Sequence, residues 1–210
     1  MRTLTNERRQ AIIDAAADLF QEMGYERTSM NEVAKRVGGS KATLYNYFAS
    51  KEALFEMVVR TYSTHFLNAA ASELSSYHDG VMTFEQNLTR FGERMMEVLL
   101  TDNQALRIYR CVLAEAGKSN IGELFRAAGP QESIAKLAEL MSLAMHKGEL
   151  AQGDSTIRAL QFTALLKAEV DSRLLEREPV PWSVAQVKNI VARGVQLFLY
   201  GAVAQVATQA

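Results

Sequence analysis

The side chains best suited to contact a polyanion are concentrated between residues 28 and 51. Lysine can donate to guanine acceptors, and the methyl groups of threonine and alanine can meet the thymine methyl. Phenolic hydroxyls can donate to phosphate, and a helix N-terminus favours an anion. We therefore expect a surface for double-stranded DNA, formed by Thr28, Ser29, Asn31, Ser40, Lys41, Ala42, Thr43, Tyr45, Asn46, Tyr47 and Lys51.

The charge of the chain is unevenly distributed along the sequence. Five cations and one anion lie between Arg27 and Lys51, whereas the whole chain of 210 residues has a net charge of −1. A basic segment in an otherwise acidic chain indicates a polyanionic partner at one end only. The alternative is that the cluster is an ordinary solvated face. Tyr47 also has two interpretations, either as a core side chain or as a phosphate donor.

Two short helices must position these residues, and their sequence is typical of a helix-turn-helix. Such a pair needs a small residue where the helices cross, a turn residue that tolerates positive φ and an inward apolar anchor. Ala34, Gly38 and Leu44 meet these needs in order. Ser29 with Glu32 forms a capping box before the first helix of the pair. The second helix begins after an N-cap at Ser40 and ends near residue 48, and Ser50 caps the helix that follows.

The remaining chain shows helical periodicity almost throughout, which predicts an all-α protein. We expect three short helices joined by one long helix to a larger helical bundle. The domains predicted are a helix-turn-helix DNA-binding domain, 1–52, and an effector-binding and dimerisation domain, 53–210. Further helices are expected over about 51–74, 82–100, 103–116, 120–147 (with an interruption at Gly129-Pro130), 154–176 and 183–207.

Residues 11–59 resemble the N-terminal DNA-binding domain of the TetR family of bacterial transcription regulators. The resemblance rests on four segments, namely Ala16 to Gly24, Thr28 to Ala34, Thr43 to Phe48 and Lys51 to Leu54. Asn46-Tyr47 departs from the aromatic or histidine pairs of many members, which leaves the details of phosphate contact open. Residues 107–130 resemble the C-terminal domain of an AefR-like branch.

The resemblance implies an all-α homodimer that binds a double-stranded DNA operator and a small-molecule effector. The dimer interface would be made largely by the last two helices, about 154–176 and 183–207. The apolar pattern of the last helix could instead reflect burial within one subunit. The expected function is a ligand-responsive repressor released from a near-palindromic operator. An activator or corepressor-dependent regulator is the alternative, and a helical carrier of hydrophobic ligands, or an enzyme, is a more remote one.

An effector pocket in the larger domain would be lined by apolar and flexible side chains, although each of these could simply be core. Arg107, Arg110 and Glu115 could orient a polar group of the ligand, or they could belong to a solvated face. The candidates for ligand contact are Phe91, Met95, Met96, Tyr109, Phe125, Met141, Met145 and Phe162.

No residue pattern indicates catalysis. The chain has no Gly-rich phosphate loop, G-x-S-x-G elbow or H-E-x-x-H motif. Its histidines, at positions 65, 78 and 146, have no metal-ligand neighbours, so we expect no enzyme, cofactor or metal site. Cys111 is either a buried small hydrophobe or a redox sensor. Without a leader or an uninterrupted apolar span, a cytoplasmic bacterial protein without a membrane partner is expected.

Overall fold

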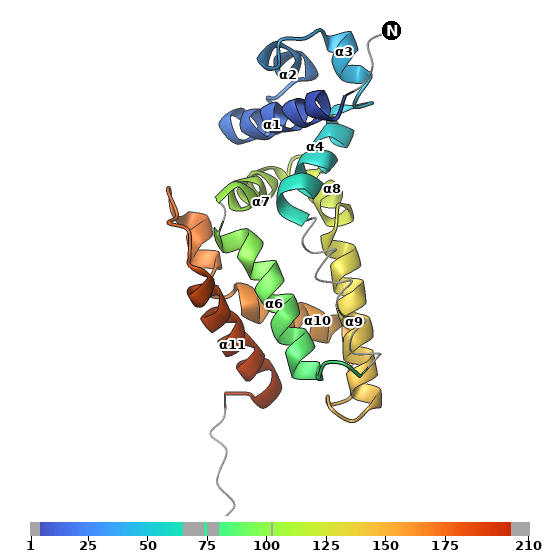
Figure 1. The fold of residues 1–210 in the computed structure, drawn as a ribbon, viewed down its shortest axis with the longest axis vertical. Coiled ribbons are helices and arrows are strands. Elements are labelled where there is room, and N and C mark those ends of the chain that lie inside the picture. The colour runs from blue at the N-terminus through green and yellow to red at the C-terminus, as the bar shows by residue number, and fades with distance from the viewer. Residues whose placement is uncertain (1–4, 65–73, 75–79, 102, 203–210) are drawn as a thin grey trace, which may run out of the picture. The chain divides into compact units, whose positions relative to one another are not determined.

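The computed structural model describes residues 5–64, 74, 80–101 and 103–202, and these residues form helices and turns without a β-strand. The prediction of an all-α fold is therefore confirmed (Figure 1). The helices are α1 (Asn6–Met23), α2 (Met30–Arg36), α3 (Lys41–Tyr45), α4 (Lys51–Val59), the π-helical turn η1 (Arg60–Thr64), α6 (Phe84–Thr101), α7 (Asn103–Glu115), α8 (Ile121–Ala127), α9 (Pro130–His146), α10 (Ser155–Lys167), the 3-10 turn η3 (Asp171–Leu175) and α11 (Val184–Tyr200).

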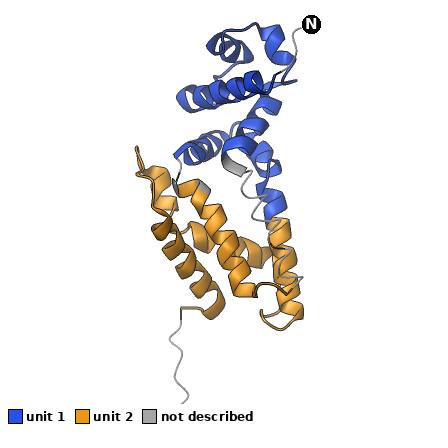
Figure 2. Ribbon diagram, viewed as in Figure 1, with its two compact units in different colours: residues 1–69, 102–133 blue, residues 70–101, 134–210 orange. Residues whose placement is uncertain are grey.

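The chain divides into two compact units (Figure 2). Unit 1 comprises residues 1–69 and 102–133, and unit 2 comprises residues 70–101 and 134–210. In this division α7 and α8 join the N-terminal helices. The functional division expected after residue 52 stays a prediction.

The first four helices of unit 1, α1 to α4, begin where hydroxyl side chains accept hydrogen bonds from the backbone. Ser29 accepts from the amide of Glu32, whose carboxylate accepts in return from the amide of Ser29, as predicted for a capping box. Ser40 and Ser50 cap α3 and α4 in the same way, also as predicted. Thr5 caps α1. Each cap satisfies an amide that the helix itself leaves without a partner.

An aromatic cluster forms the centre of unit 1. The rings of Phe20, Tyr25 and Phe55 lie with their centroids 5.1–5.5 Å apart, in tilted and edge-on arrangements that aromatic quadrupoles favour. The α7 helix packs against α1, and the thiol of Cys111 donates to the carbonyl of Phe20 at 3.5 Å. Burial raises the pKa of the Cys111 thiol, which disfavours the reactive thiolate. The N-terminal helices and α7 therefore share one core.

The helix that follows Ser50 differs from the uninterrupted helix expected over 51–74. The α4 helix ends at Val59, and residues 60–64 form a π-helical turn. Side chains of this turn contact other elements of unit 1, since Tyr62 donates to the Asp14 carboxylate and Arg60 donates to the Ala127 carbonyl at 3.5 Å. The rest of the expected helix, apart from Leu74, lies outside the described residues.

Unit 2 is built around the packing of α6 against α11. A Cβ atom at Gly92 on α6 would come within 2.8 Å of Val191 Cγ1, and one at Gly194 on α11 would come within 2.9 Å of Leu166 Cδ2. The absence of a side chain at Gly92 allows α6 to approach α11, and its absence at Gly194 allows α11 to approach Leu166 on α10. Leu88, Phe91 and the other inward residues of α6 are buried here.

Several boundaries in the C-terminal half depart from the predicted ranges. The predicted interruption at Gly129-Pro130 is confirmed, because α8 ends at Ala127 and Pro130 begins α9, where proline lacks only an amide that would be unpaired anyway. In place of one helix over 154–176, α10 is followed by a short 3-10 turn. The last helix ends at Tyr200, where Gly201 has φ 74°, and residues 203–207 of the predicted helix lie outside the described part of the chain.

Candidate nucleic-acid interface

The predicted helix-turn-helix is formed by α2 and α3. Gly38 in the connecting turn has φ 66°, a conformation that a side chain disfavours. The amide of Gly39 donates to the Ala34 carbonyl at 2.9 Å, which closes the turn. Ala34 and Leu44 are both buried, and Phe48 lies in the same core. The three roles assigned to Ala34, Gly38 and Leu44 are confirmed.

The first turn of α3 presents its side chains to solvent. Lys41 and Ala42 are exposed, and Thr43 is half-buried. The Thr43 hydroxyl lies 2.9 Å from the Ser40 hydroxyl, and Ser40 Oγ accepts from the Thr43 amide at 3.1 Å. Lys41 Nζ lies 5.8 Å from the centroid of the Tyr45 ring. An exposed helix N-terminus with these side chains has the form of the base-reading end of a recognition helix.

The remaining candidates on and after α3 also reach solvent. Tyr45 and Asn46 are exposed, with Tyr45 at 43%. Tyr47 is half-buried, and its hydroxyl oxygen accepts from the Thr5 amide at 3.2 Å. Both interpretations of Tyr47 therefore describe part of its environment, since the ring packs on the core of unit 1 while the hydroxyl keeps a proton to donate.

On α2, the candidates differ sharply in exposure. Asn31 and Ser29 are exposed, although Ser29 already caps the helix. Thr28 is only 1% exposed, and its hydroxyl lies 3.1 Å from the Leu19 carbonyl and 2.8 Å from the Gly24 carbonyl. Its amide donates to the Tyr25 carbonyl at 3.2 Å. Both donors of Thr28 are thus used within the domain, so its proposed phosphate contact has no available donor in this conformation.

Lys51 is held by the turn that follows α1. Its ammonium donates to the Tyr25 carbonyl at 3.1 Å and lies 4.2 Å from the centroid of the Tyr25 ring. The Tyr25 hydroxyl in turn donates to Glu52 at 3.4 Å, and burial raises the pKa of that hydroxyl. The pKa of Glu52 is lowered, first by a bond with its own backbone amide and then by Ser50. These contacts leave the Lys51 side chain fewer orientations than an exposed lysine has.

Not every cation of the basic segment is available to a polyanion. Arg36 forms a two-pronged ion pair with Glu22, with its shorter N–O distance 2.7 Å. Arg36 lowers the pKa of the Glu22 carboxyl, so both groups stay charged and paired near neutral pH. Of the other four cations in the segment, Arg27 donates to the Met23 carbonyl at 2.7 Å, Lys35 and Lys41 lie on the helix-turn-helix, and Lys51 lies at the start of α4.

Two residues at the start of α1 adjoin this surface although the sequence patterns did not single them out. The Thr5 amide contacts Tyr47, and the Arg8 guanidinium contacts the carbonyl of Gly38 at 3.3 Å. The only local signal was the pair of consecutive arginines at 8 and 9, which precedes the basic segment by almost twenty residues. Their proximity to the turn arises from tertiary packing.

The eight candidates for ligand contact fall in both units. Six are buried in unit 2, namely Phe91, Met95, Met96, Met141, Met145 and Phe162. Tyr109 and Phe125 belong to unit 1, where they are partly buried and their ring centroids lie 5.5 Å apart. The eight candidates therefore do not all lie in one unit, and the candidate set stays a prediction.

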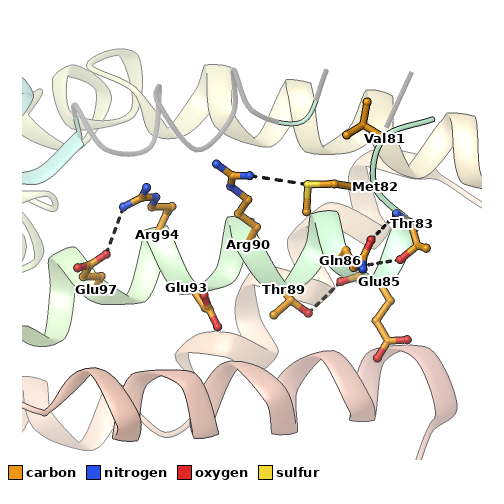
Figure 3. Close-up of a pocket in the computed structure, with 10 residues that line it drawn as sticks. All are labelled: Val81, Met82, Thr83, Glu85, Gln86, Thr89, Arg90, Glu93, Arg94 and Glu97. Carbon is orange, nitrogen blue, oxygen red and sulfur yellow. Dashed lines mark hydrogen bonds and ion pairs between the residues drawn. The ribbon is translucent and has the colours of Figure 1, made fainter. Parts of the chain in front are cut away.

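A cavity of about 930 Å³ lies along another face of α6 (Figure 3). Arg90 and Arg94 extend from the same side of the helix, and Arg94 pairs with Glu97 at 3.6 Å. None of the eight candidates lines this cavity, which is more polar than expected. Its lining consists of Val81, Met82, Thr83, Glu85, Gln86, Thr89, Arg90, Glu93, Arg94 and Glu97.

Two further features bear on other classes of function. Among the described residues, no three His, Cys, Asp or Glu side chains are grouped so that they could hold a metal ion. Within the same residues, no helix is long and apolar enough to cross a membrane. The histidines at 65 and 78 lie outside the described residues, and His146 ends α9 with a ring nitrogen 3.3 Å from the Ser142 carbonyl.

The helix-turn-helix, whose second helix begins at the exposed Lys41, indicates a DNA-binding protein. Residues 12–58 match the family model described as bacterial regulatory proteins, tetR family. Residues 86–201 match that of the AefR-like transcriptional repressor, C-terminal domain. The chain belongs to the TetR family, whose members are not enzymes.

Individual relatives agree with this assignment. The A-factor receptor protein of Streptomyces griseus is 35% identical over 92 residues, which are 41% of this chain and 33% of that protein. The transcriptional activator FasR of Mycolicibacterium smegmatis is 29% identical over 103 residues, covering 49% of this chain and 45% of FasR. The chain thus matches less than half the length of either relative.

A solved structure matches over nearly the whole chain. A TetR-family transcriptional regulator from Mesorhizobium loti superimposes with a TM-score of 0.72 at 25% identity. The match covers 94% of this chain and 98% of that one. The fold of both units thus has a counterpart in one regulator.

Proposed function

We propose that this chain is a ligand-responsive repressor that a small molecule releases from a near-palindromic operator. The observation that carries the proposal is the first turn of α3, where Lys41 and Ala42 are exposed and Thr43 is half-buried beside a buried anchor at Leu44. Recognition helices read base edges with these N-terminal positions. The description of the matching C-terminal model as a repressor domain supports the sign of regulation.

The proposed contacts divide into two groups. Lys41, Ala42 and Thr43 would meet base edges, with Asn46 beside them. Phosphate contacts would come from Tyr45, Tyr47, Lys51 and the exposed N-terminus of α2, where Ser29 and Asn31 lie. Contacts to bases specify sequence, whereas contacts to phosphate position the protein and make binding depend on salt.

A homodimer is part of the proposal. Two recognition helices must be about 34 Å apart to enter successive major grooves. The exposed apolar side chains of the last helices in unit 2 support an interface there, because Ile157, Leu160 and Leu197 are each more than 40% exposed. An effector that bound one dimer state more tightly would shift the population toward it, and only that differential affinity is required.

An experiment can separate these elements. Duplexes bound by the full chain would be selected from a random pool, and the selected site would then be used to screen small molecules for release. If the chain is a ligand-responsive repressor, the selected duplexes should share a near-palindromic site. At least one small molecule should then release the protein from that site. A chain that binds no duplex in a salt-dependent manner would contradict the DNA-binding assignment and favour a carrier of hydrophobic ligands.

Activation is a second candidate, favoured by the match to FasR, which is named as an activator. The two signs of regulation differ in a reporter assay. With the selected site overlapping a promoter, a repressor lowers transcription and its effector restores it, whereas an activator raises transcription. A small molecule that tightens rather than releases DNA binding would identify a corepressor-dependent regulator. The cytoplasmic location stays a prediction.

A further inference from the structure

The start of α1 places two consecutive arginines against the helix-turn-helix. Arg8 Nη2 donates to the carbonyl of Gly38, the turn residue with positive φ, at 3.3 Å. The guanidinium carbon of Arg9 lies 5.0 Å from the centroid of the Phe48 ring. The first helical turn of α1 thus places one guanidinium group against Gly38, before α3, and another against Phe48, after α3.

The glycine that follows in the turn permits this arrangement. A Cβ atom at Gly39 would lie 2.7 Å from Arg8 Nη2, closer than real Cβ contacts come. The missing side chain leaves room for the guanidinium beside the turn backbone. Arg8 therefore occupies a defined position beside the N-terminal end of α3, and it does so from a helix about thirty residues earlier in the chain.

Among the described residues, no carboxylate neutralises either arginine. Within the part of the chain that the structure describes, Arg8 and Arg9 form no ion pair, whereas Arg36 pairs with Glu22 at 2.7 Å. A guanidinium has five N–H donors, of which Arg8 uses one for Gly38. Both side chains are half-buried and keep contact with solvent. Two positive charges with unused donors consequently lie next to the predicted DNA surface.

We propose that Arg8 and Arg9 form a phosphate-binding site at the start of α1, which holds the DNA backbone beside the groove that α3 enters. The inference rests on the proposed function and adds a site to it. Continuity supports DNA as the occupant, since Arg8 contacts the turn before α3, while Thr5, three residues earlier, bonds Tyr47 after it. The planar guanidinium also matches a phosphate group with two parallel hydrogen bonds.

The test is the salt dependence of binding to the selected duplex. For B-DNA the slope of log K against log salt concentration falls by about 0.9 for each phosphate contact. The double variant Arg8→Gln/Arg9→Gln should therefore lose about 1.8 from the slope for each bound subunit. The loss should be equal for the selected duplex and for a shuffled duplex, because phosphate contacts carry no base information.

Two matched variants isolate charge from structure. Arg8→Lys/Arg9→Lys keeps both charges and should retain most of the slope. Arg36→Gln removes a cation of the same domain that Glu22 already neutralises, and it should leave the slope within error of the parent. Thermal unfolding of each variant shows whether the helix-turn-helix still folds. If the double glutamine variant unfolds, the single variants Arg8→Gln and Arg9→Gln replace it, each with an expected loss of about 0.9.

The outcomes are distinct. A parent protein that shows no salt-dependent duplex binding contradicts the proposed function itself. A parent that binds, with folded glutamine variants whose slope is unchanged, overturns only the phosphate site. Weaker binding with an unchanged slope also overturns it, because the arginines would then merely brace the turn against α1. A reduced slope in the glutamine variants, restored by lysine, supports the site.

Discussion

Replacement of Thr28 by valine separates a structural role from a DNA contact. Valine has nearly the shape of threonine but lacks the hydroxyl, which in the parent lies 3.1 and 2.8 Å from the carbonyls of Leu19 and Gly24. The side chain is 1% exposed, and its contact with the Leu19 carbonyl is buried, whereas that with the Gly24 carbonyl is partly buried. We expect Thr28→Val to lower the free energy of unfolding by about 1–3 kcal/mol, because the hydroxyl donor that these carbonyls share is lost.

The assay combines thermal unfolding with DNA binding. A loss of 1 kcal/mol shifts the melting temperature of a protein of this size by roughly 2–4 °C, so a decrease of roughly 2–12 °C is expected. Thr28→Ser keeps the hydroxyl and should recover most of that loss. Below the melting transition, the salt dependence of duplex binding should match the parent, because the structure leaves Thr28 no donor for phosphate.

Two results would refute this reasoning. If Thr28→Val is as stable as the parent, the buried hydrogen bonds do not contribute as inferred. If its stability is unchanged while the magnitude of the salt slope decreases by about 0.9, Thr28 contacts phosphate after a rearrangement of the turn. In that case the original interpretation of Thr28, based on its position before α2, would be the better one.

Further predictions concern packing and pH. Gly92→Ala should lower the free energy of unfolding by about 1–3 kcal/mol, because the added methyl would meet Val191 at 2.8 Å and Leu166 at 3.2 Å. A denaturant titration measures this change. Burial, followed by the bond to Asp14, raises the pKa of Tyr62 to about 12 from an ordinary 10.0. The folded state favours the protonated hydroxyl, so this contribution to stability is complete below pH 10 and is lost as the pH rises toward 12. Tyr62→Phe should show a smaller loss of unfolding free energy over that interval.

Each of these has a control within the chain. Gly117→Ala places a methyl where no atom lies within 4 Å and φ is not positive, so its stability should stay close to that of the parent. If Gly92→Ala and Gly117→Ala changed the free energy of unfolding equally, this would contradict the close packing of α6 against α11. For the pH experiment, an alkaline stability profile of Tyr62→Phe that coincides with the parent profile would show that the contact with Asp14 does not couple to folding.

The features that the sequence predicted well are those set by neighbouring residues. The helix-turn-helix depends on Ala34, Gly38 and Leu44, which lie within eleven residues, and each role follows from local sterics. The capping serines at 29 and 40 act on amides three residues away. Because these interactions are short in sequence, their pattern could be read before any tertiary contact was known.

The state of individual site residues depended on partners that are distant in sequence. Arg36 is neutralised by Glu22, and Lys51 is held by Tyr25, at separations of 14 and 26 residues. The Thr28 hydroxyl donates to the carbonyl of Leu19 on α1. The approach of Arg8 to Gly38 joins residues 30 positions apart. No local pattern specifies which of these cations and hydroxyls remain available, because packing between helices decides it.

The central claim, that the first turn of α3 reads base edges, is tested most directly by comparing the base preferences of the parent with those of Lys41→Ala and Thr43→Ala. All three would be selected against the same random duplex pool at one salt concentration. The account predicts that each variant relaxes its preference at one or two adjacent positions in each half-site, at a cost of about 1–3 kcal/mol for the preferred base. Preferences identical to those of the parent at every position, in variants that still fold and bind, would contradict it.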